Sequence, residues 1–598
     1  MPFIFSNANI QENRIVFIYE ECAYSGVRRI AGRVRDDIRK VFGTKPIGVE
    51  YANFADTAAF FPYPVFFGTV GKSEILDKLA ETNAINLFDI AGESEVYSFR
   101  VVEDLEYKGF TFKAAIIIAG SDIRGTIYGL FRLSEMFGVS PLSDWLDIKC
   151  PKLEKYTLTP SDSVVSKAPS VKYRGFCLNS DSAAFTRWCR HNFDGSVDKA
   201  YARIIELLLR LKGNLLCPLT EGSELSEEYG IVPGPSKDEP RILFDVSYPP
   251  KIYEVMSSVY EQGNREMWIA NAGDIFTREY PLAFFLDLAY DFNRWKGEAE
   301  ESAQIYSMEF VRCNFARLPR IEQSEIARLL LGCSKYNDVQ RPRDAGLGAG
   351  TQFAFGEGER VLNEIDNLMN SAAQMYRKMG DDDSFAFYEL VYLPVTARLN
   401  ALKMLILTDL NHAYASFGST MANTLAQSIH ECIKKDRKLM EKLDSIHKGK
   451  WRGMSRSAGI GLDRAREGFR YPVVHTFDPV PDPYLIVSVP ATGEHSSPGH
   501  DLLMNLALDP LTCGGFIELS TGSESKVYYD ITSEDDFIDV MDPGKSVKYG
   551  QSRRPFIFVD RLKLNDKEHA EGIVCITSGD QIINIRVPVY NPRISEDE

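Results

Sequence analysis

The 598-residue chain has neither an excess of basic charge nor a long apolar run. Its 68 Lys and Arg residues stand against 84 Asp and Glu residues, which gives a formal net charge of −16. A general nucleic-acid or anionic-membrane binder needs a positive surface, so the charge argues against both kinds of partner. No stretch approaches the roughly 18 consecutive apolar residues typical of a membrane-spanning helix, so we expect none.

Paired cysteine motifs and a targeting segment are also lacking. The ten cysteines are scattered without a CxxC pair, which argues against a disulfide framework and predicts reduced, mostly buried thiols. The start of the chain has no basic segment, and polar Ser6–Arg14 interrupts its apolar residues, so no secretory signal is visible. We therefore expect an intracellular protein as written, or a secreted one if the true N-terminus is missing.

Several catalytic motifs are missing as well. None of the eight histidines forms HxH or HExxH, and no serine lies in a GxSxG elbow, so zinc hydrolases and esterases have no support. The glycine-rich Gly346–Gly350 follows no predicted strand and lacks a later acidic partner, so it is a weak dinucleotide fingerprint. The sequence therefore predicts no metal site.

The patterns that are present predict four domains. Residues 1–160 alternate apolar strand-like runs with amphipathic stretches, which indicates an N-terminal α/β domain. Residues 170–296 repeat strand and helix, as in a (β/α)8-type barrel, but hold only four or five of eight units, so we predict an incomplete barrel. Residues 297–455 predict a helical bundle, and the short strands of 460–598 predict an antiparallel β-sandwich.

Polar residues recur where the predicted barrel strands end. In a β/α barrel, chemistry lies on the loops at the carboxyl ends of the strands. This rule selects Asn179–Asp181, Glu221, Asp238, Glu239 and Asp274. Two such carboxyls could act as general acid and general base in glycoside cleavage, one of them with a raised pKa. The alternative is that these carboxylates cap helices or lie in solvent.

Aromatic residues near the same strand ends fit a sugar site. Trp188 and Tyr248 follow predicted strands, and each would stack on a sugar ring. Packing in a core is the alternative for Trp188.

Several stretches of the chain match one known family in order and spacing over about residues 10–460. They are AGSDIRGTIYG (Ala119–Gly129), PSVKYRGFCLN (Pro169–Asn179), EYGIVPGPSKDEP (Glu228–Pro240), MWIANAGD (Met267–Asp274) and GKWRGM (Gly449–Met454). Together they resemble glycoside hydrolase family 115, the xylan α-1,2-glucuronidases.

The resemblance implies release of glucuronate or 4-O-methylglucuronate side groups from xylan by carboxylate acid/base catalysis, without a cofactor. It also implies a xylan-derived oligosaccharide or polysaccharide as partner, and a homodimer formed outside the barrel. The catalytic residues would be Asp181, Glu239 and Asp274. The sugar contacts would be Asn179, Trp188 and Glu221.

The chain departs from the family pattern inside the barrel. The family's Asn-Asp-Glu is Asn179, Ser180 and Asp181 here, and its His-His-Glu-Pro is Lys237–Pro240. Roughly a hundred residues or more are missing after Pro240 relative to a full barrel. Two interpretations stay open. One is a family 115 glycosidase; the other is an impaired or inactive member, or an incomplete gene model, that keeps at most a carbohydrate-binding or interaction role.

Overall fold

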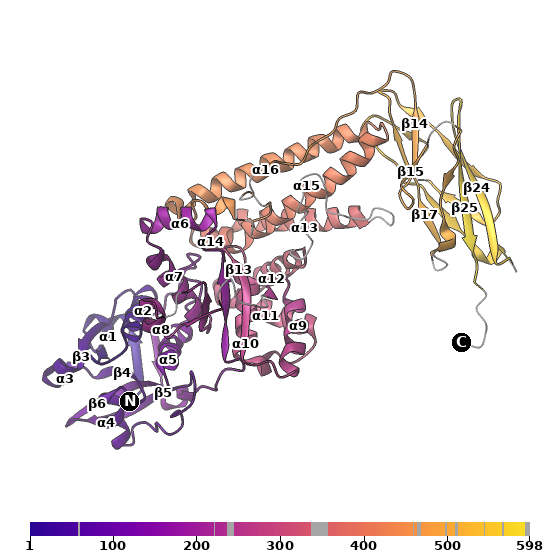
Figure 1. Ribbon diagram of the computed structural model, residues 1–598. Helices are drawn as coiled ribbons and strands as arrows, with labels where there is room; N and C mark the ends of the chain where they lie inside the picture. Colours follow the sequence, from indigo (N-terminus) through magenta and orange to yellow (C-terminus); the bar gives the residue numbers. More distant parts are fainter. Residues whose placement is uncertain are drawn as a thin grey trace. The chain divides into compact units, whose positions relative to one another are not determined.

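The computed structural model describes residues 1–57, 60–219, 222–235, 244–336, 357–457, 460–462, 464, 468–496, 499–508, 512–542, 544–564 and 567–592. It has a mixed helix-and-sheet, multidomain architecture (Figure 1). The chain divides into two compact units. Unit 1 comprises Met1–Asp338, Ser371–Thr396 and Glu441–Arg466, and unit 2 comprises Val339–Asn370, Ala397–Met440 and Glu467–Glu598. The four-domain division remains a prediction.

A six-stranded sheet with the order β3-β2-β4-β6-β5-β8 forms the amino-terminal layer of unit 1. Its strands are β2 (Ile15–Tyr19), β3 (Ile47–Glu50), β4 (Tyr63–Thr69), β5 (Tyr97–Tyr107), β6 (Phe110–Gly120) and β8 (Val164–Val165). The accompanying helices are α1 (Asn7–Gln11), α2 (Ser25–Phe42), α3 (Tyr51–Thr57), α4 (Glu74–Glu81) and α5 (Ile123–Met136). Strands β2 and β4 are buried along their whole length, which is why they are continuously apolar. A separate antiparallel pair joins β1 (Phe3–Ser6) to β7 (Lys155–Leu158).

The second sheet of unit 1 is parallel and has the order β11-β10-β9-β13-β12. Its strands are β9 (Tyr173–Leu178), β10 (Leu215–Cys217), β11 (Val232–Pro233), β12 (Phe244–Asp245) and β13 (Met267–Gly273). The accompanying helices are α6 (Ala183–Phe193), α7 (Val197–Arg210), α8 (Glu224–Tyr229), α9 (Pro249–Glu261) and α10 (Glu279–Tyr290). Within the described residues this sheet does not close, in agreement with the predicted incomplete barrel.

The cysteines correct one prediction from the sequence. Cys177 in β9 and Cys217 in β10 lie directly opposite each other, with their Cα atoms 4.4 Å apart, and form a disulfide. Only strand pairing brings them together, because 40 residues separate them in the chain. The other eight cysteines, all within the described residues, form no disulfide, and three of them, Cys189, Cys333 and Cys432, are buried. The expectation of ten reduced, mostly buried thiols is therefore wrong.

Long helices follow the parallel sheet. They are α11 (Ala299–Asn314), α12 (Arg320–Lys335), α13 (Glu357–Lys378), α14 (Asp381–Phe387), α15 (Leu393–Ser416) and α16 (Met421–Gly449), with a π-helical turn at Tyr388–Tyr392. Among the described residues, one stretch, Asp381–Ser416, is long and apolar enough to cross a membrane. Its most apolar window is 72% buried inside the molecule, which is the behaviour of a core helix in a bundle.

The carboxyl-terminal part of unit 2 consists of short strands around one apolar core, which includes Leu485, Val487, Leu519, Ile557 and Val574. The strands are β14 (Leu485–Val489), β15 (Glu494–His495), β16 (Leu502–Leu503), β17 (Gly514–Phe516), β18 (Glu518–Thr521), β19 (Val527–Tyr528), β20 (Asp530–Ser533), β21 (Ile538–Met541), β22 (Ser546–Val547), β23 (Phe556–Val559), β24 (His569–Ser578) and β25 (Gln581–Tyr590). Nearly all pairings are antiparallel, as predicted, but β16 pairs with β25 in parallel.

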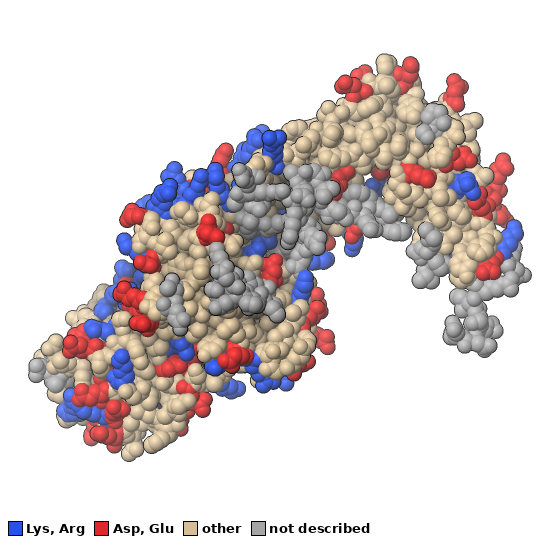
Figure 2. Space-filling view, viewed as in Figure 1, with Lys and Arg blue, Asp and Glu red and all other residues tan. Residues whose placement is uncertain are grey.

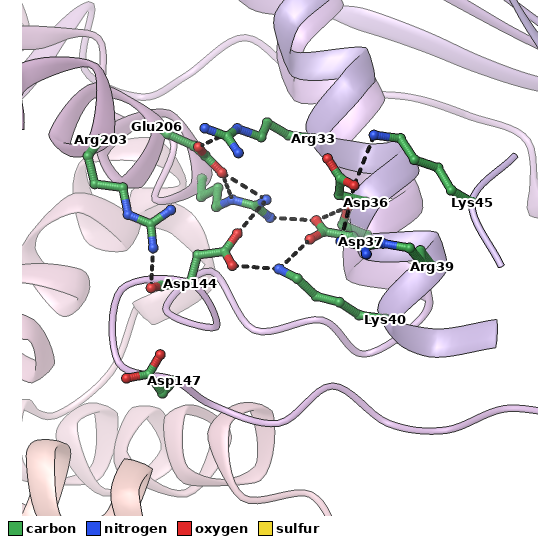
Figure 3. Close-up of polar contacts among 12 residues, drawn as sticks. Arg33, Asp36, Asp37, Arg39, Lys40, Lys45, Asp144, Asp147, Arg203 and Glu206 are labelled. Carbon is green, nitrogen blue, oxygen red and sulfur yellow. Dashed lines mark hydrogen bonds and ion pairs between the residues drawn. The ribbon is translucent and has the colours of Figure 1, made fainter. Parts of the chain in front are cut away.

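A buried ion-pair network in unit 1 connects α2 with α7 and with the segment that follows α5 (Figure 3). The Arg210 guanidinium contacts Asp37 Oδ2 at 2.9 Å and Glu206 Oε1 at 3.1 Å. Lys40 Nζ lies 3.3 Å from Asp37 Oδ1 and 2.5 Å from Asp144 Oδ1. Because Asp37 and Arg210 are almost completely enclosed, their charges are compensated within the network, by each other and by Lys40 and Glu206 respectively.

Asp37→Asn is expected to lower the free energy of unfolding of unit 1 by about 2 kcal/mol, because the buried Arg210 charge loses one of its two nearest carboxylates and keeps only Glu206 in close contact. Chemical denaturation followed by tryptophan fluorescence measures this loss. Asp36→Asn is the matched control, since Asp36 is more exposed and pairs with Arg39 and Lys45 at the surface. The control should change stability by less than about 1 kcal/mol, and equal losses in the two variants would contradict the prediction.

Candidate active site

A cavity of about 1160 Å³ lies beside the carboxyl ends of β9, β10 and β11. Ser180 follows β9, Pro218 and Leu219 follow β10, and Pro235 follows β11; all four line the cavity. The first turns of α7 and α8 complete much of the wall. The volume exceeds the roughly 300–1,000 Å³ of pockets for drug-sized ligands, so it has room for several sugar rings.

The charged residues of the cavity carry both signs. They are Arg29, Asp198, Lys199, Glu224 and Glu228, and Arg29 Nε pairs with Glu228 Oε1 at 2.7 Å. Among the residues drawn in colour in Figure 2, acidic and basic side chains are likewise interspersed over the visible face. The cavity can therefore offer carboxylate acceptors and cationic donors to a polar ligand at the same time.

The structure brings together three of the predicted site residues, because β9 and β13 are neighbours in the sheet and end at the same edge. The backbone N–H of Asn179 donates to Gly273 O at 2.9 Å. The Ser182 hydroxyl, one residue after Asp181, donates to Asp274 Oδ1 at 2.7 Å. Asp181 is exposed and Asp274 is half-buried, so both carboxylates lie at the solvent-facing edge of the sheet.

Trp188 occupies a different environment from the predicted one. Its side chain is only 4% exposed and packs against Trp145, Phe185 and Trp451, while its indole N–H donates to Lys450 O at 3.0 Å. A ring enclosed in this way presents no free face to a sugar. The described contacts of Trp188 therefore correspond to core packing, the alternative weighed from the sequence.

Two predicted site residues, Glu221 and Glu239, lie outside the described residues, as does Asp238. Tyr248 is half-buried at the start of α9, and its hydroxyl donates to Glu300 Oε1 at 3.0 Å. Burial, followed by the hydrogen bond to Glu300, raises the pKa of Tyr248 to about 12, so this phenol stays protonated at neutral pH.

Sequence reasoning missed two buried glutamates near the strand exits. Burial raises the pKa of Glu279 to about 7, although a hydrogen bond from Trp145 acts in the opposite direction. Burial also raises the pKa of Glu389 to about 8, against the lowering effect of Lys450. The signal for Glu279 was its place five residues after Asp274, at the exit of β13. Glu389 lies within a helical region and gave no local signal.

The part of the chain that the structure describes contains no group of three or more His, Cys, Asp or Glu residues arranged to hold a metal ion. What the exits of β9 and β13 do provide is carboxylates, an amide and hydroxyls, although of Asn179, Ser180, Asp181 and Asp274 only Ser180 lines the cavity. This set of groups can bind sugar hydroxyls and transfer protons to or from a bound glycoside.

Residues 166–243 and 240–343 match the model of glycosyl hydrolase family 115. This part of the chain, about 30% of its length, is similar to glycoside hydrolase family 115. The matched region contains the parallel sheet, Asn179, Asp181 and Asp274. The match consists of two segments that meet at residues 240–243, where the sequence departs from the full barrel of family 115.

A solved family 115 structure has a similar fold. It is described as a novel family GH115 4-O-methyl-alpha-glucuronidase, BtGH115A, with specificity for decorated arabinogalactans. The comparison covers 99% of this chain and 100% of that chain, with a TM-score of 0.60 and 16% sequence identity. No curated protein matches the chain in sequence. At this level of identity the likeness establishes a shared fold.

Proposed function

We propose that the protein is a glycosidase that releases glucuronate or 4-O-methylglucuronate from decorated xylan. The observation that carries the proposal is the meeting of Asn179, Asp181 and Asp274 at the carboxyl ends of β9 and β13. This edge lies within the region that matches family 115, and Ser180 of the same loop lines the 1160 Å³ cavity. The homodimer implied by the family resemblance remains part of this proposal.

In the proposed reaction, one carboxyl protonates the leaving oxygen and a second carboxylate activates water. Asp274 suits the second role, because the Ser182 hydroxyl orients its carboxylate. Asp181, which is exposed at the same edge, and Glu239, which lies outside the described residues, are the candidates for the acid. Asn179 would position a sugar hydroxyl beside them.

A second candidate function is carbohydrate binding without turnover, by an impaired member of the family. The open sheet favours it, because β11 and β12 are edge strands here, whereas a closed barrel has none. The replaced family residues after β9 and at Lys237–Pro240 favour it as well.

The test is to incubate the purified, folded chain with aldouronic oligosaccharides from glucuronoxylan and, in parallel, with uronate-decorated arabinogalactan. Released uronic acid is measured by anion-exchange chromatography. Turnover of the xylan substrate is the expected result, and turnover of arabinogalactan alone would redirect the proposal to the substrate named for the solved relative. If neither is cleaved, calorimetric titration distinguishes the two functions: saturable binding supports the impaired member, and no binding contradicts both.

A further inference from the structure

The turn that carries Asp274 has an unfavourable backbone conformation. It connects the end of β13 at Gly273 with the start of α10 at Glu279. Within it, Ile275 has a φ of 65° and Thr277 a φ of 73°, which is the left-handed region that β-branched residues avoid. The N–H of Phe276 donates to Asp274 O at 2.8 Å, which closes a tight turn around Ile275. Such a backbone, at a cost of about 1–3 kcal/mol per residue, persists only where its surroundings hold it.

Apolar packing supplies part of this restraint. The side chains of Ile275 and Phe276 are each only 1% exposed. The Phe276 ring stacks on Trp451 with a centroid distance of 4.3 Å, and Trp451 contacts Trp145 edge-on at 5.2 Å. At the end of the turn, Arg278 donates to Asn271 O at 3.0 Å. The packing of Ile275 and Phe276 and the hydrogen bond of Arg278 therefore both hold the turn in place.

A hydrogen bond connects Glu279, at the end of the strained turn, with a segment of unit 1 that lies far away along the chain. Its side chain is buried, and Glu279 Oε1 accepts a hydrogen bond from Trp145 Nε1 at 2.8 Å. Glu279 is also the first residue of α10, so it lies directly at the end of the turn. One side chain thus connects the end of the strained turn to the segment that follows α5, 134 residues earlier in the chain.

Three further segments bring ionisable groups to this cluster. Glu389, in the π-helical turn, accepts a hydrogen bond from Trp451 Nε1 at 2.8 Å and lies 4.0 Å from Lys450 Nζ. Asp147 contacts Lys450 Nζ at 2.7 Å and His447 Nδ1 at 2.8 Å. Lys450 therefore compensates the carboxylates of Asp147 and Glu389, whereas the Glu279 carboxyl accepts its hydrogen bond from the Trp145 indole.

We infer that Glu279 is a positioning residue for the family 115 reaction: its carboxyl locks the Gly273–Glu279 turn and so holds Asp274 against Ser182. The role of Asp274 in this inference rests on the proposed function, but the restraint of the turn by Glu279 does not. Loss of the acceptor should leave the Trp145 indole N–H unsatisfied and remove the contact that anchors the end of the turn. The turn would then relax to a less strained backbone, and the Asp274 carboxylate would move away from Ser182.

The experiment measures amide hydrogen exchange of the full chain by mass spectrometry, on peptides that cover residues 273–280. Glu279→Ala is expected to speed exchange of the Phe276 and Arg278 amides at least about tenfold, because both are hydrogen-bonded within the turn. Glu279→Gln keeps the volume and the acceptor oxygen, so its exchange should stay within about twofold of wild type. Glu206→Gln is the matched control, since it alters a buried carboxyl on α7 away from the turn.

Unchanged exchange in Glu279→Ala would overturn the inference, and so would equally fast exchange in the Ala and Gln variants. If Glu279→Ala does not fold, Trp145→Phe removes the donor instead, and faster exchange of the same peptide is expected. If wild type cleaves the xylan substrate, Glu279→Ala should lower kcat at least about tenfold with KM within about twofold, and Glu279→Gln should restore most of kcat. An inactive wild type would count against the proposed function. The hydrogen-exchange result would still show whether Glu279 holds the Gly273–Glu279 turn in place.

Discussion

Asp274→Asn is expected to lower kcat for uronate release by at least about 100-fold, because an amide cannot take a proton from water as a carboxylate does. The substitution preserves the shape of the side chain, and the amide oxygen can still accept the Ser182 hydrogen bond. The thermal unfolding midpoint should therefore stay close to that of wild type. Steady-state kinetics on aldouronic oligosaccharides, together with a melting curve, measure both quantities.

Two further variants sharpen this prediction. Ser182→Ala removes the hydroxyl that orients Asp274 and also the N-cap of α6, so it should lower kcat less than Asp274→Asn while costing about 1 kcal/mol of stability. Asp291→Asn changes a carboxylate at the opposite end of α10 and should leave kcat within about twofold of wild type. If Asp274→Asn retained half of the wild-type activity, Asp274 would not be a catalytic residue.

The stability of unit 1 is expected to fall as the pH rises from 5 to 9. Burial raises the pKa of Glu279 from 4.5 to about 7 and that of Glu389 from 4.5 to about 8. Between the unfolded pKa of 4.5 and the folded pKa values of about 7 and 8, the folded chain binds more protons than the unfolded chain. The free energy of unfolding therefore decreases with increasing pH. The stabilisation is fully present below about pH 4.5 and is lost as the pH rises through about 7 and 8, and for the two groups together it is on the order of 8 kcal/mol.

Neighbouring charged residues also shift the pKa values of the buried carboxyls. Lys450 lowers the pKa of Glu389, whereas Asp147 and Glu279 raise it, so burial together with these two carboxylates outweighs the single lysine. Asp287 contributes in the same direction, since burial raises its pKa to about 6, against the lowering effect of Arg294. The predicted fall in stability therefore begins near pH 4 to 5, is steepest between about pH 5 and 6, and becomes shallower above about pH 7 as the folded groups ionise in turn.

Urea denaturation at pH 5, 7 and 8.5 measures this dependence. Tryptophan fluorescence is a suitable probe, because all five tryptophans lie in unit 1. Glu389→Gln should flatten the pH dependence most, since it keeps an acceptor for Trp451 Nε1 but cannot ionise. Glu571→Gln, which alters an exposed carboxylate paired with Arg586, should leave the slope unchanged. Parallel curves for wild type and Glu389→Gln would contradict the prediction.

The carboxyl ends of the strands were the most informative part of the sequence for the site. Asn179, Asp181 and Asp274 could be selected because each follows an apolar run, and parallel strands must end at one edge of their sheet. Glu279 and Glu389 could not be found in this way. Their pKa values depend on Trp145, Lys450 and Trp451, which come from segments more than a hundred residues away from Glu279.

Trp188 is another residue whose environment could not be predicted from the sequence alone. A tryptophan after a strand fits a sugar platform and a core position equally well, and the residues around it in the sequence do not distinguish them. The contacts with Trp145 and Trp451, which come from segments on either side of it in the chain, decide in favour of the core.

The amino-acid sequence by itself determined the type and order of the main elements, the excess of acidic charge and the shortage of barrel units, because these follow from neighbouring residues and from length. The tertiary structure alone decided three other features: the disulfide between Cys177 and Cys217, the strained turn at Asp274, and the burial of Glu279 and Glu389. Each of these depends on contacts between segments far apart in the chain, and no local pattern of residues encodes such contacts.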